Sequence, residues 1–479
     1  MKTNVITFLI ACGLFVIACG GEEENPTSET YTVNFETMGG IPVPPPQIIE
    51  KGNFANEPSE LPVKDGVTFS GWYTESGFRY NFKSNPVTRN ITLFAKYWAG
   101  PKKYIVINDY DWSYLERKIH EIFGDSQGKD VAVGQGVLFY IFERPLEIHI
   151  STLRKQLIES EKYSIPLLIQ LDPITFWDNV PELWNWFDPG IPGYNEDNKA
   201  NVEWTSWSMD DAVKIGWLNW GTQIRLRPMA NLFSKAYQAA VKARMDAFLS
   251  ILSEWYTELP EAKKYLLIGV KITGELAVGV NNWYYTGGNL LYGLSEKYDP
   301  KTGINIYNKP SRSNGDVSTI GYAGVKSAGI KSAGTLTGED IAELERKFTL
   351  FVSDIADDYS IPREKIFAHA GGSDNDLDAC INDKVCPSWS FYGSDAINAK
   401  NATYCMNLIK NSDAPHWGLA EWAISSEKPS DWSDAIRRAF NIDRCYFLSI
   451  YTNVIGNNNG STINESAVAG IKAVQNDNY

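Results

Sequence analysis

The chain has 479 residues, and its 58 acidic and 44 basic side chains give a formal net charge of −14 at pH 7. No run of lysine or arginine interrupts this acidic background, which argues against a polyanionic partner such as a nucleic acid. A chain of this length exceeds one ordinary domain, so we expect at least two folded units.

The first residues are typical of a secretion signal. A short basic start is followed by an apolar stretch, Val5 to Val16, that is too short to span a membrane. Residues 16–19, Val-Ile-Ala-Cys, resemble a bacterial lipobox, whose cysteine becomes the lipidated first residue after cleavage. The resemblance implies a signal peptide over 1–18, a lipid anchor on Cys19 and a mature chain of 479 − 18 = 461 residues. The alternative is an ordinary signal peptide with a chance cysteine.

Residues 19–30 form a polar, acidic tether without periodicity. Its Gly-Gly-Glu-Glu-Glu-Asn sequence resembles the surface-export tag of Bacteroidetes lipoproteins. The two resemblances imply a protein held in the outer membrane or at the cell surface, with membrane contact through the lipid anchor only.

Residues 31–98 consist of short β-type runs and turns. Residues 31–35 and 90–98 alternate in polarity as half-buried strands do, whereas the prolines of 41–47 exclude a central strand there. The ordered elements VNFETMGG, FSGWYTESGFRYNF and ITLFAKYW resemble the Listeria–Bacteroides repeat, a β-grasp-like module of bacterial surface proteins. The resemblance implies a stalk or adhesion module, in which Trp72 is expected to belong to the core.

From residue 103 to 479, apolar β-type runs alternate with amphipathic helices, which is typical of an α/β fold with parallel strands. Strands are predicted over 131–137, 166–172, 223–229, 266–272, 365–370, 388–393, 416–422 and 445–452. A further run, 104–109, is either a strand outside the ring or the true first strand. Helices are predicted over 149–161, 233–257, 338–358, 399–410 and 431–442, with Thr337 as a cap of the third. The pattern predicts a (β/α)8 TIM barrel with long βα-loop insertions, preceded by the small β-grasp-like domain.

Two predicted insertions, 173–222 and 281–336, are rich in aromatic residues. Loops that follow barrel strands lie at the C-terminal face, where active sites are built, so these rings are candidates for stacking on sugars. The alternative, favoured for any single tryptophan, is that the rings form the cores of the insertions. The candidates for substrate binding here are Trp177, Asn281, Asn282 and Trp283.

Acids at the C-terminal ends of barrel strands are the candidates for catalysis. Glu421 stands in HWGLAEWAI (416–424), which otherwise reads as a buried strand, and a carboxyl group in such a place is either paired or used. Glu275 follows the predicted fourth strand and Glu421 ends the seventh, so the two are expected across the barrel mouth from each other. A glycosidase needs two carboxyl groups, one to protonate the leaving oxygen and one to attack or to activate water.

Glutamates at the ends of strands four and seven of such a barrel resemble glycoside hydrolase clan A, a group of retaining enzymes. The resemblance implies that Glu275 is the acid/base and Glu421 the nucleophile, with their carboxyl groups about 5 to 5.5 Å apart. The sequence departs from the clan at Gly274, where members usually have an asparagine that binds the sugar 2-hydroxyl. Asn281 or Asn282 is the candidate replacement.

Further polar and aromatic side chains near the strand ends are candidate substrate ligands. Tyr392 is expected to hydrogen-bond the nucleophile, whereas a histidine in such a place is often structural. The full set is Asp172, His369, Tyr392, His416, Trp417 and Trp422.

The cysteines and short motifs give no sign of a metal or cofactor site. Cys380 and Cys386 could pair in an oxidising compartment, while Cys405 and Cys445 lie in apolar surroundings and are expected as buried thiols. The sequence has no CxxC with a nearby histidine and no P-loop, GxSxG, HExxH or GxGxxG pattern. We therefore expect neither a metal nor a cofactor.

Taken together, these features predict a cell-surface lipoprotein that hydrolyses an oligosaccharide or polysaccharide by a retaining two-carboxylate mechanism. Two alternatives stay open: a non-catalytic glycan-binding lipoprotein on a degenerate barrel, and an adhesion protein whose β module is the active part.

Overall fold

The computed structural model describes residues 29–108, 115–219, 223–276, 278–282, 298–299, 304–305, 317–371, 376–451, 454–456 and 463–479. Cys19, the predicted signal peptide, most of the tether and Trp283 lie outside the described residues. The chain divides into two compact units, one up to residue 97 except for 66–68, and one made of 66–68 and 98–479. The two units are described separately.

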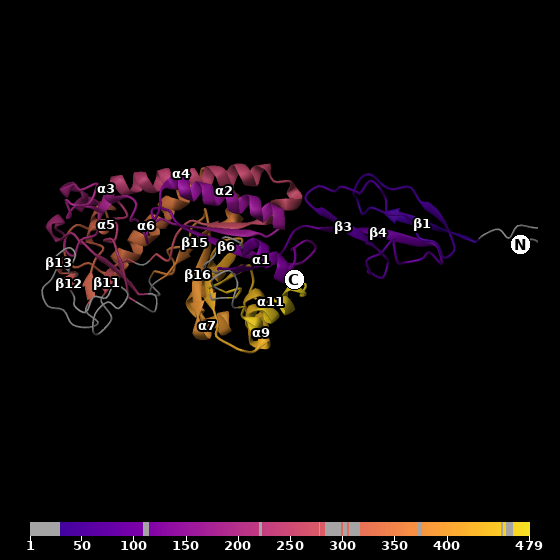
Figure 1. Ribbon diagram of the computed structural model, residues 1–479. Coiled ribbons are helices and arrows are strands. Elements are labelled where there is room, and N and C mark those ends of the chain that lie inside the picture. The colour runs from indigo at the N-terminus through magenta and orange to yellow at the C-terminus, as the bar shows by residue number, and fades with distance from the viewer. Residues whose placement is uncertain are drawn as a thin grey trace, which may run out of the picture. The chain divides into compact units, whose positions relative to one another are not determined.

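The first unit is a four-stranded sheet with the strand order β2-β1-β4-β3 (Figure 1). Its strands are β1 (Thr30–Glu36), β2 (Gln47–Glu50), β3 (Thr68–Tyr73) and β4 (Ile91–Trp98). Strand β2 begins only after the proline-rich stretch and lies at the sheet edge, where missing backbone donors are tolerated. Trp72 is buried, and its ring packs edge-on against Phe35 at 4.9 Å and Phe69 at 5.4 Å between centroids, in the core position expected of it.

The second unit is a closed barrel of eight parallel strands, in the order β10-β15-β16-β17-β18-β5-β6-β7. The predicted TIM barrel is thus confirmed by the strand order itself. In chain order the barrel strands are β5 (Lys103–Ile107), β6 (Val131–Tyr140), β7 (Leu167–Asp172), β10 (Leu267–Lys271), β15 (Ile366–Ala370), β16 (Cys386–Tyr392), β17 (Trp417–Ala423) and β18 (Cys445–Ile450).

One predicted barrel strand is wrong. Residues 223–229 supply β9 (Gln223–Leu226), which forms an antiparallel hairpin with β8 (Gly216–Asn219) outside the barrel. The run alternates apolar and polar residues, as a half-buried antiparallel strand does, whereas parallel barrel strands are apolar throughout. The run at 104–109 is the true first strand, β5, so the two errors cancel and the predicted fourth to eighth strands keep their numbers.

Helices cover the outside of the barrel (Figure 1). The described helices are α1 (Leu115–Phe123), α2 (Leu146–Tyr163), α3 (Pro181–Trp184), α4 (Lys235–Glu258), α5 (Tyr322–Ser327), α6 (Gly338–Asp357), α7 (Gly393–Ile397), α8 (Thr403–Asn411), α9 (Pro429–Phe440) and α11 (Glu465–Gln475). Thr337 caps α6 in a reciprocal capping box with Asp340, as its sequence predicts. None of the helices in the described part of the chain combines the length and apolar character that a membrane crossing requires.

Short strands outside the barrel belong to the second insertion. They are β11 (Val280–Asn282), paired with β14 (Val317–Thr319), and β12 (Tyr298–Asp299), paired with β13 (Ile304–Asn305).

The inside of the barrel is apolar towards the N-terminal ends of the strands and polar towards their C-terminal ends. The apolar cluster is Tyr104, Val106, Ala132, Leu168, Ile268, Phe367, Cys386, Tyr446 and Phe447. Further along the same strands, Asn108 accepts a hydrogen bond from Gln170 at 2.7 Å and donates one to Ser449. The barrel is therefore closed at one end, while its polar groups gather at the end where βα loops begin.

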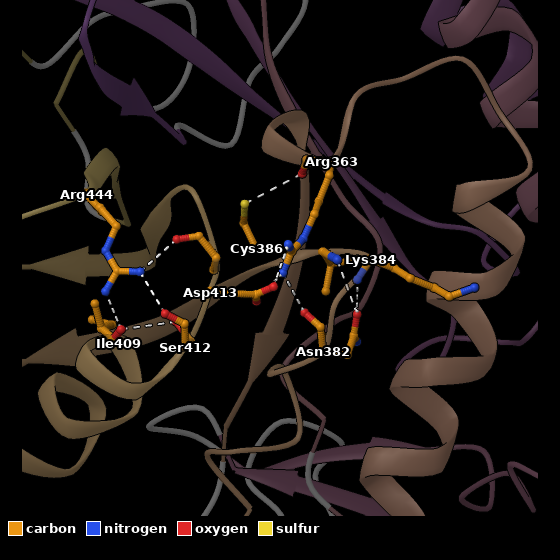
Figure 2. A network of polar contacts seen from close by, with 10 residues as sticks. Arg363, Asn382, Lys384, Cys386, Ile409, Ser412, Asp413 and Arg444 are labelled. Carbon is orange, nitrogen blue, oxygen red and sulfur yellow. Dashed lines mark hydrogen bonds and ion pairs between the residues drawn. The ribbon is translucent and has the colours of Figure 1, made fainter.

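A polar network joins the loops that precede strands β15 to β18 (Figure 2). Arg363 binds both carboxylate oxygens of Asp413, at 2.7 and 3.2 Å, and the carbonyl of Asn382 at 3.0 Å. Arg444 donates to the carbonyls of Ile409 and Ser412. These residues tie neighbouring loops together at the N-terminal face, so their role is stability rather than chemistry.

The first insertion is anchored by a buried acid, Glu203. Its carboxylate accepts hydrogen bonds from the backbone N–H groups of Gly321, Ala323 and Gly324, at 2.9 to 3.1 Å. Glu203 is fully buried, and burial raises its pKa to about 7, although the N–H donors oppose this shift. The acid thus joins the two insertions through the start of α5.

The described cysteines Cys380, Cys386, Cys405 and Cys445 are all buried, and none of them forms a disulfide bond. Cys380 donates to the carbonyl of Leu377 and Cys386 to that of Arg363. The suggested Cys380–Cys386 pairing is therefore wrong: each thiol has its own carbonyl partner in the packed interior.

Candidate active site

The two candidate catalytic acids lie at the C-terminal mouth of the barrel on opposite sides of β15 and β16. Glu275 follows β10, and Glu421 lies near the end of β17. Both side chains are partly exposed. Burial raises the pKa of Glu275, the negative charge of Glu421 raises it further, and Lys271 and Ser390 oppose the shift. The carboxyl groups are thus close enough to interact electrostatically.

A β-bulge directs Glu421 to the barrel interior. Trp417 and Leu419 belong to the outer core, between strands and helices. Strict alternation would place Glu421 on that same outer side. The pairing of β16 with β17 skips Ala420, because Trp389 pairs with Leu419 and the next residue, Ser390, pairs with Glu421. The extra residue turns the carboxyl group inward.

Tyr392 holds Glu421 in place, as its position in the sequence suggested. Its hydroxyl donates a hydrogen bond to Oε2 of Glu421. Burial raises the pKa of Tyr392, and the neighbouring charge of Glu421 raises it further, so the phenol stays protonated and acts as a donor. Ser390, two residues earlier on β16, interacts with both groups: a hydrogen bond with Ser390 opposes the rise in the pKa of Glu275 and in that of Tyr392.

Below the two acids, Lys271 and His369 fill the barrel interior. Both side chains are buried, and the Lys271 Nζ lies 3.2 Å from Nδ1 of His369. The other imidazole nitrogen, Nε2, lies 2.9 Å from Ser390 Oγ. His369 was a candidate substrate ligand, but both of its ring nitrogens are already engaged with protein groups.

A buried carboxylate accounts for the glycine before Glu275. A Cβ atom on Gly274 would lie only 2.4 Å from Oδ2 of Asp172, so any asparagine here collides with that acid. Asp172 itself accepts from the backbone of Ile174 and Thr175 and from the Thr175 hydroxyl, at 2.7 to 3.0 Å. Asp172 is therefore a turn-forming acid with its oxygens occupied, which contradicts its expected role as a sugar ligand.

Three predicted aromatic ligands are closed to a sugar. The rings of Trp177, Trp417 and Trp422 are at most 1% exposed. Each indole N–H donates to a backbone carbonyl, of Pro228, Asp443 and Ala396 respectively. The structure contradicts the stacking role, because these rings have no open face. Other tryptophans of the first insertion are buried too, namely Trp184, Trp186 and Trp204, so these rings form the core of the insertion.

The other predicted ligands lie apart from the two acids or outside the described structure. His416 directly precedes β17 at the N-terminal mouth and stacks on Tyr446 at 4.3 Å, so it cannot contact a ligand at the opposite mouth. Asn281 is buried, and its amide donates to the carbonyl of Ile215 at 2.9 Å. It is therefore not free to replace the missing asparagine. The side chain of Asn282 and the whole of Trp283 lie outside the described residues.

The sequence analysis did not predict that Lys271 and Ser390 belong to the site. Lys271 interrupts the apolar run 266–272, LLIGVKI, which is the same signal that singled out Glu421: a charge inside a buried strand. Ser390 gives no such signal, because its hydroxyl carries no charge and costs far less to bury than a charged group. Gly371 was missed as well, and a Cβ atom there would lie 2.0 Å from Cγ of Glu275. The described residues contain no group of three or more His, Cys, Asp or Glu arranged to hold a metal ion.

Comparison with known proteins identifies the N-terminal unit. Residues 31–96 match the Listeria–Bacteroides repeat domain, so the chain carries this repeat at its N-terminus. No curated protein matches the chain.

Solved structures similar to the chain include three carbohydrate-active enzymes. PbGH5A, a glycoside hydrolase family 5 enzyme from Prevotella bryantii B14, is 8% identical with a TM-score of 0.38, covering 77% of this chain and 87% of the other. The β-galactosidase from Marinomonas ef1 is 10% identical with a TM-score of 0.41, covering 78% and 59%. The catalytic domain of β-amylase from Paenibacillus polymyxa is 10% identical with a TM-score of 0.42, covering 78% and 98%. At these values the likeness carries no argument about activity.

Proposed function

We propose that the barrel is a glycoside hydrolase that uses Glu275 and Glu421 as its two carboxyl groups. The observation that carries the proposal is the pair itself: two partly exposed acids at the C-terminal mouth, electrostatically coupled and held by Ser390 and Tyr392. Neither carboxyl group is consumed by backbone donors, unlike that of Asp172. A glycosidic bond placed between the two acids would meet a proton donor on one side and a nucleophile on the other.

The proposed reaction has two steps. Glu421 attacks the anomeric carbon while the bond to the leaving oxygen breaks, and that oxygen takes the proton of Glu275. In the second step Glu275 takes a proton from water, whose oxygen replaces Glu421 on the sugar. The raised pKa of Glu275 suits the first step, because it keeps this carboxyl group protonated at higher pH than an ordinary glutamate. The anomeric configuration is retained, which requires a separation of about 5 to 5.5 Å between the carboxyl groups.

The test is hydrolysis by the full chain of a panel of aryl glycosides, oligosaccharides and polysaccharides. Glu275→Gln and Glu421→Gln are compared with Glu143→Gln, a matched control. Glu143 also follows a barrel strand, β6, but its side chain is 42% exposed and pairs only with Arg144 at 3.7 Å. We expect loss of cleavage in the first two variants and none in the control. Glycan binding without cleavage by the wild type would reject the enzyme and favour the glycan-binding alternative.

We also propose that the protein is a surface lipoprotein anchored through Cys19. The support is the sequence alone: the apolar stretch Val5 to Val16, followed by Val-Ile-Ala-Cys and an acidic tether. Metabolic labelling with an alkyne fatty acid should mark the wild type and leave Cys19→Ala unlabelled. An unlabelled wild type that is still secreted would support an ordinary signal peptide instead.

A further inference from the structure

The hydrogen-bond chain below the two acids has a direction that its chemistry fixes. The ammonium group of Lys271 has donors only, so Nδ1 of His369 must accept its hydrogen bond. Burial and the charge of Lys271 both lower the pKa of His369, which keeps the imidazole neutral. A neutral ring that accepts at Nδ1 carries its proton on Nε2, and this nitrogen faces Ser390 Oγ at 2.9 Å.

We infer that this hydrogen-bond chain leads to the carboxyl group of Glu275. Ser390 Oγ accepts from His369, so its own proton is free to go to another acceptor, and Ser390 interacts with both Glu275 and Tyr392. The hydroxyl of Tyr392 donates its hydrogen bond to Glu421. A carboxyl oxygen is a stronger acceptor than a phenol oxygen, and a hydrogen bond with Ser390 lowers the pKa of Glu275, so we assign the Ser390 hydroxyl as a donor to Glu275. One oxygen of Glu275 is thereby occupied, and the other is left to hold and deliver the catalytic proton.

Burying the charged ammonium group of Lys271 has a desolvation cost, which nearby negative charges must offset. Lys271 is 2% exposed, and burial lowers its pKa, while the charges of Glu421, Asp172 and Glu275 raise it again. Asp172 and Glu421 belong to β7 and β17, and Glu275 follows β10, the strand of Lys271 itself. No other role for Lys271 is visible in its described contacts, since its hydrogen-bond partner is His369.

We propose that Lys271 is a positioning residue: through His369 and Ser390 it orients the carboxyl group of Glu275 as proton donor to the leaving group. The proposal rests on the proposed glycoside hydrolase function. Without the ammonium group, the imidazole can take either tautomer, Ser390 can donate to His369 instead, and Glu275 loses its fixed partner.

The test compares two substrates of the same sugar that differ in their need for acid catalysis. A 2,4-dinitrophenyl glycoside has a leaving group that departs without a proton, whereas a 4-methylumbelliferyl glycoside depends on one more strongly. For Lys271→Met in the full chain, we expect kcat/KM to fall about 10- to 100-fold on the methylumbelliferyl substrate, the size of a misplaced catalytic group. On the dinitrophenyl substrate we expect a fall of less than about 3-fold, because this leaving group needs no proton.

Lys365→Met is the matched control. Lys365 is a half-buried lysine that lies just before β15 at the N-terminal end of the barrel, where it donates to the carbonyl of Leu267 at 2.8 Å and to the hydroxyl of Tyr446 at 2.5 Å. We expect this variant to cleave both substrates at rates within about 2-fold of the wild type, because it removes no group of the chain that ends on Glu275. Ser390→Ala, a smaller change at a partly exposed site, should repeat the leaving-group dependence of Lys271→Met and keeps the test valid if the latter does not fold.

Equal losses on both substrates, or none on either, in Lys271→Met and Ser390→Ala would overturn the positioning role while the hydrolase function stands. If the wild type cleaves neither substrate for any sugar in the panel, the proposed function itself fails and this role falls with it.

Discussion

Two regions of the second unit each contain a glutamate whose pKa is raised by burial, yet they are built differently. Glu203 is fully buried, and the backbone N–H groups of Gly321, Ala323 and Gly324 donate to its carboxylate. Glu275 at the barrel mouth is partly exposed, contacts the side chain of Ser390 and interacts with the charge of Glu421.

The difference shows which acids with a raised pKa are candidates for an active site. A raised pKa is common to both regions, so it does not separate a structural acid from a catalytic one. The two acids differ in the groups that bind their carboxyl oxygens. Backbone donors that fill a carboxylate hold a loop in place, whereas side-chain partners and an open oxygen leave room for a substrate.

The largest effect is expected for Glu421→Gln. Removing the nucleophile should lower kcat/KM on the order of 10⁴-fold, since it abolishes the covalent step. The variant should unfold within a few degrees of the wild type, because Glu421 is partly exposed and the amide can still accept from Tyr392. Hydrolysis rates and a thermal melt measure both parts, and retained activity would show that Glu421 is not the nucleophile.

A substitution that only displaces the acid should have an intermediate effect. In Gly371→Ala, the added Cβ atom would lie 2.0 Å from Cγ of Glu275, so Glu275 must move. We expect kcat to fall about 100-fold, the usual result of moving a catalytic group by about 1 Å. Steady-state kinetics give the value, and an unchanged kcat would mean that the position of Glu275 is not critical.

The same distinction predicts the reverse result for Glu203→Ala. The change leaves three backbone N–H groups buried without their acceptor, which should lower the free energy of unfolding by about 3 kcal/mol or more. Activity per folded molecule should stay within about 2-fold, because Glu203 holds a loop and does not touch the mouth. Urea unfolding and active-site titration provide the measurements. Lost activity in stable protein would contradict the structural role.

The smallest effect is a pH dependence. Burial raises the pKa of Glu203 to about 7 from its ordinary value of 4.5. Between these two pH values the folded state holds a proton that the unfolded state has lost. Stability therefore falls as pH rises from 4.5 to 7. The free energy of unfolding of the wild type, relative to the non-titrating Glu203→Gln, should decrease on the order of 2 kcal/mol over this range. A flat difference would show that Glu203 is ionised in the folded protein.

The sequence predicted the barrel better than it predicted the site. Apolar runs locate the parallel strands because these are buried on both faces, whereas in the run at 223–229 the apolar residues Ile224, Leu226 and Met229 are separated by polar residues or proline. Glu421 was found because a charge inside a buried strand has a cost, and Lys271 could have been found by the same argument.

The aromatic candidates failed for a reason that is partly visible in the sequence. Trp422 directly follows Glu421, and neighbours on a strand point to opposite faces, so it could not share the barrel interior with that acid. For Trp417, the same argument does not tell on which face of the strand the ring lies. By simple alternation it shares a face with Glu421, and only the bulge at Ala420, seen in the strand pairing, separates them. The occupied oxygens of Asp172 likewise depend on a turn that residue types alone do not reveal.

The most direct test of the central claim is to trap the intermediate. The protein would be treated with a 2,4-dinitrophenyl 2-deoxy-2-fluoro glycoside of whichever sugar it cleaves, digested, and analysed by mass spectrometry. We predict one sugar added to the peptide that contains 417–423, located on Glu421. A sugar on another residue, or cleavage that inverts the anomeric configuration and leaves no adduct, would contradict the pairing of Glu275 and Glu421 as acid/base and nucleophile.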